Sequence, residues 1–275
     1  MRSQTKSKLQ DRTIEDFGRQ WTAFDDAAGF FGSKELLADF VMPFDLAQVR
    51  GWRVLDLGAG TGRHVLALLE SGAARVVAVE PSQAIEVVRE KTRGFEDRVT
   101  LLQIRGDQIP PTAEFDAVFS IGVIHHIPNP APVVQAVYGA LKPGGKFVVW
   151  LYGKEGNTLY LLFVKPLRWL STHLPHWALT ALVRVLDLPL VFYLYVCRRL
   201  PSVRLPLANY LRSIIAPLPA DKRRLVIYDQ LNPAYAKYYT RKEAEALMAV
   251  APFQIAVHHR RGYSWVVIGE KPQAG

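Results

Sequence analysis

The sequence predicts an α/β fold around a mainly parallel sheet, and two observations carry this prediction. Short apolar runs alternate with helical stretches between residues 51 and 152. These runs are apolar at nearly every position, which is typical of parallel strands that helices cover on both faces. Strands that alternate with helices form βαβ units, so we expect successive strands to lie side by side in the same direction.

The elements of this core follow one another along the chain. Apolar runs predict strands at 52–57, 75–80, 99–105, 115–121 and 146–152. The helices expected between them cover 62–71, 82–93 and 131–141, with Ser82 as the N-cap of the second. The Lys-Pro-Gly-Gly cluster after Leu141 is expected to end the last of these helices.

Residues 153–240 break the alternation, because they are rich in Leu, Tyr, Trp, Pro and Arg. We expect them to form helices inserted after the fifth strand. The pattern resumes with a helix at 242–250 and strands at 253–259 and 263–270, and Gly262 between these strands predicts an antiparallel hairpin. We therefore divide the chain into an N-terminal helical cap (1–50), a core (51–152), a helical insertion (153–240) and a C-terminal segment that completes the core (241–275).

Composition excludes several classes of protein. The chain has 275 residues, of which 49% are hydrophobic, and this excludes disorder of the whole chain. A single cysteine, Cys197, excludes a disulfide framework and a thiolate metal site. The first eighteen residues are polar and charged and lack the apolar segment of a secretory signal, so we expect a cytoplasmic protein.

The basic residues are concentrated in the insertion. Of the formal net charge of +9, nearly all lies between residues 154 and 224, and such a patch attracts a phosphorylated substrate, an anionic membrane or nucleic acid. The same segment holds a long apolar stretch at 177–197, but Arg184 and Asp187 near its middle disfavour a transmembrane helix. A lid over a lipophilic acceptor, or peripheral contact with the inner membrane surface, fits better. An ordinary amphipathic lid with solvated arginines stays open as an alternative.

The strongest local motif is Val-Leu-Asp-Leu-Gly-Ala-Gly-Thr-Gly at residues 54–62. Its alternate glycines allow a sharp turn from strand to helix and let a ligand lie against the bare backbone. Dinucleotide sites use G-x-G-x-x-G, whereas here the spacing is G-x-G-x-G and Asp56 precedes it. A carboxylate favours a cationic amino-acid ligand over a pyrophosphate. Glu80, which ends the second expected strand, is placed to accept hydrogen bonds from ribose hydroxyls, and Asp107 to reach an adenine amino group.

With four further segments, this motif resembles the core of class I S-adenosylmethionine-dependent methyltransferases. The segments are AVEPS at 78–82, GD at 106–107, FDAVFSIGVIHHIPNP at 115–130 and LKPGGKFVVW at 141–150. The resemblance is to the small-molecule and lipid type, like the methyltransferases of ubiquinone biosynthesis. It implies a Rossmann-like sheet of seven strands, with the last one reversed, and S-adenosyl-L-methionine as the cofactor.

The resemblance also implies roles for single residues. Cofactor contacts are expected from Asp56, Gly58, Ala59, Gly60, Gly62, Glu80, Pro81, Asp107, Gln108, Ser120 and Gly122. Phe17 and Trp21 resemble an N-terminal segment that closes over the cofactor, where an aromatic face suits a sulfonium. Simple packing of a helix onto the core is the alternative for these two rings.

Methyl transfer sets limited chemical demands. The sulfonium is already activated, so no metal is expected, and the main requirements are alignment and exclusion of water. A base is needed only where the acceptor loses a proton. His126 and His125, which follow the fourth expected strand, are the candidate bases, and a structural or acceptor-facing role is the alternative.

Tyrosines dominate the candidate acceptor site. The residues expected to contact the acceptor are Tyr152, Asp229, Asn232, Tyr235 and Tyr239. Their rings suit a lipophilic or aromatic acceptor, and they suit a helix core equally well.

The hypothesis from the sequence is therefore a methyltransferase that acts on a small, lipophilic or aromatic acceptor. A nucleic-acid methyltransferase is disfavoured, because IGVIHH stands at 121–126 where many base-amino methylators carry a D/N-P-P-Y/F-type motif. A nicotinamide-dependent oxidoreductase is disfavoured by the glycine spacing, and a non-catalytic cofactor-binding protein stays open. The sequence leaves open the acceptor, the methylated atom and the oligomeric state.

Overall fold

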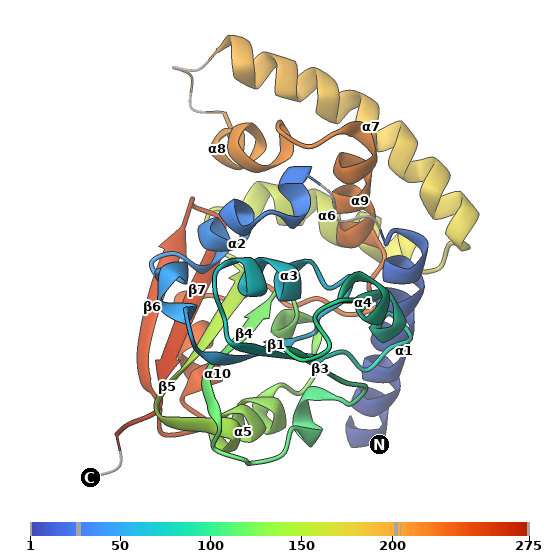
Figure 1. The fold of residues 1–275 in the computed structure, drawn as a ribbon. Helices are drawn as coiled ribbons and strands as arrows, with labels where there is room; N and C mark the ends of the chain where they lie inside the picture. Colours follow the sequence, from blue (N-terminus) through green and yellow to red (C-terminus); the bar gives the residue numbers. More distant parts are fainter. Residues whose placement is uncertain (1, 26–28, 201–202, 204, 274–275) are drawn as a thin grey trace.

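The computed structural model describes residues 2–25, 29–200, 203 and 205–273. Within this part of the chain seven strands form one sheet in the order β3-β2-β1-β4-β5-β7-β6 (Figure 1). They are β1 (Arg53–Leu57), β2 (Arg75–Val79), β3 (Val99–Leu102), β4 (Phe115–Ile121), β5 (Leu141–Tyr152), β6 (Gln254–Arg260) and β7 (Ser264–Glu270). Strands β1 to β5 pair in parallel, and β7 runs antiparallel to both β5 and β6. The predicted mostly parallel sheet with a C-terminal antiparallel hairpin is confirmed.

Helices cover both faces of the sheet. Those packed on it are α2 (Lys34–Val41), α3 (Arg63–Glu70), α4 (Ile85–Lys91), α5 (Ala131–Ala140) and α10 (Arg241–Met248). One apolar cluster joins α5 and α10 to the sheet, and a second joins α2, α3 and α4 to it. Val54 and Leu55 fall in different clusters because side chains alternate along a strand. The continuous apolar runs of the sequence thus reflect burial from two sides.

The remaining helices surround the carboxyl ends of the parallel strands. They are α1 (Arg2–Ala23), α6 (Thr158–Ser171), α7 (His176–Arg199), α8 (Ala208–Tyr210) with a π turn at Leu211–Ile215, and α9 (Ala220–Leu231). All but α1 belong to the insertion between β5 and α10, as expected. Figure 1 shows α7 along the outer edge of the molecule, on the far side of α9 from the sheet.

The Lys-Pro-Gly-Gly segment differs from the expectation. Helix α5 ends at Ala140, but β5 begins at Leu141 instead of residue 146. Leu141 pairs with Phe115, and the next pair joins Ala117 to Lys146, so the residues between bulge out of the ladder. Gly144 has φ 76°, a left-handed conformation that glycine adopts without strain. The breaker residues therefore make a bulge inside a strand, because the buried Leu141 already belongs to the sheet.

Candidate active site

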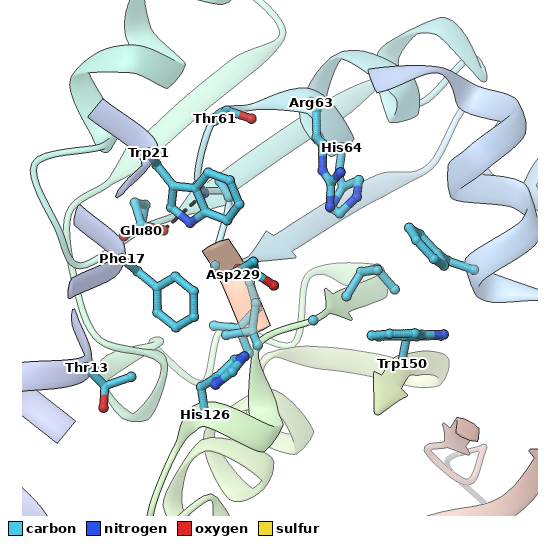
Figure 2. Close-up of a pocket in the computed structure, with 18 of the residues that line it drawn as sticks. Thr13, Phe17, Trp21, Thr61, Arg63, His64, Glu80, His126, Trp150 and Asp229 are labelled. Carbon is cyan, nitrogen blue, oxygen red and sulfur yellow. Dashed lines mark hydrogen bonds between the residues drawn. The ribbon is translucent and has the colours of Figure 1, made fainter. Parts of the chain in front are cut away.

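A pocket opens at the carboxyl ends of β1, β2, β4 and β5, beneath α1 and the insertion (Figure 2). The strand order reverses between β1 and β4, and ligands of open α/β sheets bind outside the strand ends at such a switch point. The glycine loop forms one wall, and apolar side chains of the insertion, among them Ile214, Leu218 and Leu225, form the opposite one. The pocket thus joins a bare backbone to an apolar chamber.

The glycine loop requires its glycines. Gly58, Gly60 and Gly62 have φ of 81°, 52° and 77°, in the left-handed region that other residues rarely adopt. A Cβ on Gly58 would stand 2.4 Å from a methyl carbon of Val123, and one on Gly60 would stand 3.3 Å from the Trp21 ring nitrogen. The loop therefore turns sharply and stays free of side chains where it faces the pocket.

Glu80 lines the pocket and is held on three sides. Its Oε2 accepts the backbone N–H of Gly60 at 3.1 Å, and its Oε1 accepts the N–H and hydroxyl of Ser82 at 3.0 and 2.6 Å. Helix α4 begins only at Ile85, later than expected, and the Ser82 hydroxyl accepts the N–H of Ala84 at 3.2 Å in the turn before it while donating to Glu80. These three hydrogen bonds fix the carboxylate in place and leave Oε2 able to accept one more, and contact of Glu80 with a ribose hydroxyl stays a prediction.

Asp56 is fully buried, and neither of its carboxylate oxygens has a hydrogen-bond partner among the described residues. Burial raises the pKa of this carboxyl to about 7, an effect that Arg63 opposes and Glu80 reinforces. A buried carboxylate without partners is costly unless a cation or donor meets it. Asp56 and Gly62 are not among the residues that line the pocket, so contact of Asp56 with a positively charged ligand, such as the ammonium of an amino acid, stays a prediction.

Helix α1 covers the glycine loop. Phe17 and Trp21 both line the pocket, with their rings stacked at 6.2 Å (Figure 2). A Cβ on Gly18 would lie 2.9 Å from that of Ser82, so the helix also lies close against the segment that follows β2. The structure places these two rings over the loop, where they were expected to close over a cofactor.

The other expected cofactor residues divide into two groups. Ala59, Pro81 and Gly122 line the pocket. Asp107 and Gln108 do not, because the Asp107 carboxylate pairs with Arg105 at 2.8 and 3.1 Å. Ser120 is fully buried with a hydroxyl that has no partner among the described residues, and it lies behind the pocket surface. A role for Asp107, Gln108 and Ser120 stays a prediction.

The two histidines after β4 differ. His126 lines the pocket, and its Nδ1 lies 2.8 Å from the carbonyl oxygen of Tyr235. A carbonyl only accepts, so Nδ1 carries the proton and Nε2, which has no partner among the described residues, presents its lone pair. Burial lowers the pKa of His126 to about 3, so the ring is neutral at pH 7. His125 is fully buried against Tyr152, with ring centroids 3.8 Å apart, and does not line the pocket.

A polar network crosses the pocket beside His126. Tyr152 at the end of β5 donates to Asp229 of α9 at 3.3 Å and accepts from Gln230 at 2.6 Å. Gln20 of α1 donates to the other oxygen of Asp229 at 3.0 Å. Burial raises the pKa of Asp229, and the Gln20 hydrogen bond opposes this effect. The network brings together three segments that are far apart in sequence.

Three expected acceptor contacts lie elsewhere. Asn232 donates to the Asp16 carbonyl at 3.1 Å and to Gln20 at 3.0 Å, which ties α9 to α1. Tyr235 contributes its carbonyl to His126, and the buried Tyr239 pairs through its backbone with Tyr152. None of the three is among the pocket-lining residues. Their direct contact with an acceptor stays a prediction, while Tyr152 and Asp229 do face the pocket.

Arg63, for which the sequence yielded no prediction, points into the pocket from the first turn of α3 (Figure 2). Its guanidinium donates to the Phe31 carbonyl at 3.2 Å and lies 4.1 Å from the centre of the Phe31 ring. Burial lowers the pKa of Arg63 to about 10, so it stays charged at neutral pH. An arginine directly after the third glycine of the motif was the signal available in the sequence. His64 and Trp150 also line the pocket and were likewise missed.

Metal ligation finds no support in this geometry. Within the residues that the structure describes, no group of three or more His, Cys, Asp or Glu side chains is arranged to hold a metal ion.

Comparison with known proteins places the core in context. Residues 55–149 match a family described as a methyltransferase domain. Curated relatives include the tRNA U34 carboxymethyltransferases of Pseudoalteromonas atlantica, 35% identical over 38% of this chain and 33% of the relative, and of Chromohalobacter salexigens, 34% identical over 42% and 37%. The chain thus spans little more than a third of the length of these relatives.

Solved structures share the fold over more of the chain. The Burkholderia thailandensis 1,6-didemethyltoxoflavin-N1-methyltransferase superposes with a TM-score of 0.54, 16% identity, and coverage of 98% of this chain and 90% of its own. For human N-acetylserotonin methyltransferase the TM-score is 0.51 and the identity is 13%, with coverage of 94% of this chain and 57% of that protein. At these identities the likeness concerns the fold.

Proposed function

We propose that the chain, whose residues 55–149 match a methyltransferase domain, uses S-adenosylmethionine to methylate a small, lipophilic or aromatic acceptor. The observation that carries the proposal is the pocket itself, in which the glycine loop and Glu80 meet an apolar chamber closed by the insertion, while the buried Asp56 stands two residues before the loop's first glycine. Methyl transfer is inferred from the match to a methyltransferase domain, and the class of acceptor is inferred from the apolar chamber.

The residues around the glycine loop fit S-adenosylmethionine. The unpartnered Asp56 would receive the ammonium of its methionine part, and the fixed Glu80 would receive its ribose hydroxyls. Phe17 and Trp21 would cover it and exclude water. When bound, S-adenosylmethionine supplies a methyl group on a positively charged sulfur, which makes the methyl carbon ready for displacement.

The chamber on the other side suits a compact apolar molecule with one polar group. Its walls are largely apolar side chains, whereas Tyr152, Asp229, Arg63 and His126 present polar atoms from different elements. A few convergent polar groups in an apolar pocket fix the orientation of a ligand. We assign orientation of the acceptor to Tyr152 and Asp229, and contact with an anionic substituent to Arg63.

His126 is placed to remove a proton from the acceptor. Its Nε2 lone pair is held ready by the Tyr235 carbonyl on the opposite ring nitrogen. As the acceptor oxygen or nitrogen bonds to the methyl carbon, its own proton becomes strongly acidic, so even a weakly basic ring accepts it. The C–S electron pair stays on sulfur, and the proton moves to Nε2 of His126.

A nucleic-acid acceptor is the second candidate. It is favoured by the names of the curated relatives and by the basic insertion. The match to those relatives covers only 38% to 43% of this chain, and the chamber is lined mainly by apolar side chains. We therefore rank it below the small acceptor.

Transfer of a labelled methyl group decides between the two. The full chain is incubated with methyl-labelled S-adenosylmethionine and either a lipid extract or total tRNA, with Asp56→Asn as the control that lacks the cofactor carboxylate. We expect label in the organic-soluble fraction with the native protein alone. Label in tRNA instead would replace the proposed acceptor class, and absence of S-adenosylmethionine binding by calorimetry would refute the activity.

A further inference from the structure

Helices α6 and α7 follow one another on the outside of the molecule, and each of them packs against α9. A short turn at 172–175 joins them, and α7 runs along the outer edge of the ribbon (Figure 1). On length and composition, α7 is the one helix among the described residues that could cross a membrane, yet most of its apolar window is not buried inside the protein. Something other than the protein core must account for this apolar surface.

The exposed apolar side chains follow helical spacing. On α7 they are Trp177, Val185, Leu188, Phe192 and Tyr195, exposed by 75, 62, 70, 68 and 54%, and from Val185 onward these residues recur every three or four positions. On α6 the corresponding set is Leu159, Leu162, Phe163, Trp169 and Leu170, exposed by 61, 67, 73, 71 and 53%. Each helix thus carries a continuous apolar face in water, and contiguous exposed patches of this kind mark interaction sites.

The opposite face of α7 is fixed to the protein. Leu179, Val183 and Leu194 are buried there. Asp187, 2% exposed, accepts hydrogen bonds from Arg223 of α9 at 2.5 and 3.0 Å and from Arg224 at 2.9 Å. A helix held by a buried ion pair along its length cannot leave the domain to span a bilayer. Its exposed face can only contact a surface that lies alongside.

The charges on α6 and α7 indicate which kind of partner surface their exposed faces can bind. Asp187 is the sole acidic residue in α6 and α7, and it is buried and paired. The exposed cations are Lys165, Arg184, Arg198 and Arg199, so the exposed faces are basic and apolar together. Two copies of the chain joined through this face would bring like charges together, whereas anionic lipid headgroups would neutralise them. Trp169 and Trp177 lie on either side of the turn between the two helices, and exposed tryptophans suit the interface between headgroups and acyl chains.

We propose that the exposed faces of α6 and α7 bind the surface of an anionic lipid bilayer, with both helices lying along it. The apolar side chains enter the boundary between headgroups and acyl chains, and the flanking cations contact the headgroups. The binding does not depend on which acceptor the pocket holds, so its test is independent of the proposed activity.

Flotation of the full chain with lipid vesicles tests the proposal. We expect the protein to float with vesicles of phosphatidylcholine and phosphatidylglycerol, and at least about tenfold less with phosphatidylcholine alone. The variant Leu188→Ser/Phe192→Ser should bind the anionic vesicles at least about tenfold more weakly. Phe95→Ser/Val250→Ser, which removes exposed apolar side chains outside the insertion, should bind like the native protein.

A second pair of variants tests the charges. Arg184→Gln/Arg199→Gln should remove the preference for anionic vesicles, and Arg50→Gln/Arg75→Gln, at exposed positions outside the insertion, should keep it. All four substituted pairs are exposed, so their folding is checked by circular dichroism and is expected to be native.

Three results would overturn the proposal. The native protein would stay unbound with both kinds of vesicle, or Leu188→Ser/Phe192→Ser would float as well as the native protein. Alternatively, light scattering would show a native dimer that this variant converts to a monomer, which would assign the face to a second copy of the chain.

Discussion

The Nδ1 atom of His126 lies 2.8 Å from the backbone carbonyl oxygen of Tyr235, 109 residues further along the chain. This contact fixes the tautomer of a histidine that the sequence singles out, and it uses a backbone atom of a tyrosine expected to act through its ring. Burial makes the imidazole neutral, although the contact with Tyr235 itself raises the pKa, and the contact leaves Nε2 with its lone pair and without a partner among the described residues. The proposed chemistry and the stability of the protein both depend on that neutral ring.

The neutral His126 predicts a loss of stability in acid. Its folded pKa of about 3 lies below the ordinary 6.5, so between these values the unfolded chain binds the proton and the free energy of unfolding falls as pH falls. Such a group contributes a slope of about 1.4 kcal/mol per pH unit. Between pH 6.5 and 5.0, His126→Gln should therefore lose about 2 kcal/mol less than the native protein in urea unfolding.

The exposed His173, replaced by Gln, serves as the control for loss of a histidine. An equal pH dependence in His126→Gln and the native protein would contradict a neutral buried ring.

The buried Asp56 predicts opposite effects on stability and binding. Its folded pKa of about 7 lies above the ordinary 3.8, so the folded protein binds the proton more tightly, and Asp56 destabilises it increasingly as pH rises from 3.8 to 7. Asp56→Asn should raise the melting temperature of the ligand-free protein at pH 8. The same change should weaken S-adenosylmethionine binding by calorimetry about tenfold or more, because the cofactor loses its counter-ion.

Native binding should also weaken as pH falls below 7, where Asp56 becomes protonated. A variant that binds the cofactor as tightly as the native protein would remove Asp56 from the cofactor site.

The loop glycines predict a matched pair of stabilities. Gly58→Ala places a Cβ at φ 81° and 2.4 Å from Val123, whereas Gly262→Ala places one at φ 78° with nothing within 4 Å. Left-handed backbone costs about 1–2 kcal/mol at both positions, and the clash adds about 1–3 kcal/mol at Gly58 alone. Urea unfolding should show this difference, and equal losses would mean that Val123 moves away freely.

The ion pair between α7 and α9 predicts a large loss of stability. Asp187→Ala leaves Arg223, whose side chain is 14% exposed, without its carboxylate, and removal of one partner from a buried pair costs about 3–5 kcal/mol. The matched control is Glu86→Ala, whose side chain is 65% exposed and whose pair with the 61% exposed Arg89 should contribute less than about 1 kcal/mol. If Asp187→Ala unfolded like the native protein, α7 would be held on α9 by its apolar contacts alone.

The sequence by itself determined the mainly parallel character of the sheet and the glycine loop. Continuous apolar runs at β1, β2 and β4 predicted parallel strands because a strand buried on both faces leaves no alternation. The motif at 54–62 predicted the loop because only glycine adopts its left-handed turns. Both are local properties, and local conformational limits are visible in neighbouring residues.

Only the tertiary structure decided how the pocket is completed. Arg63, Gln20 and Gln230 reach the site from three separate helices, and no short-range pattern links them. Asn232 and Tyr239 do not line the pocket, because the Asn232 side chain is hydrogen-bonded to α1 and Tyr239 is hydrogen-bonded through its backbone to β5. Which side chains face the pocket depends on how the insertion packs over the strand ends. This packing joins residues far apart in the sequence, so the spacing of residues along the chain does not predict it.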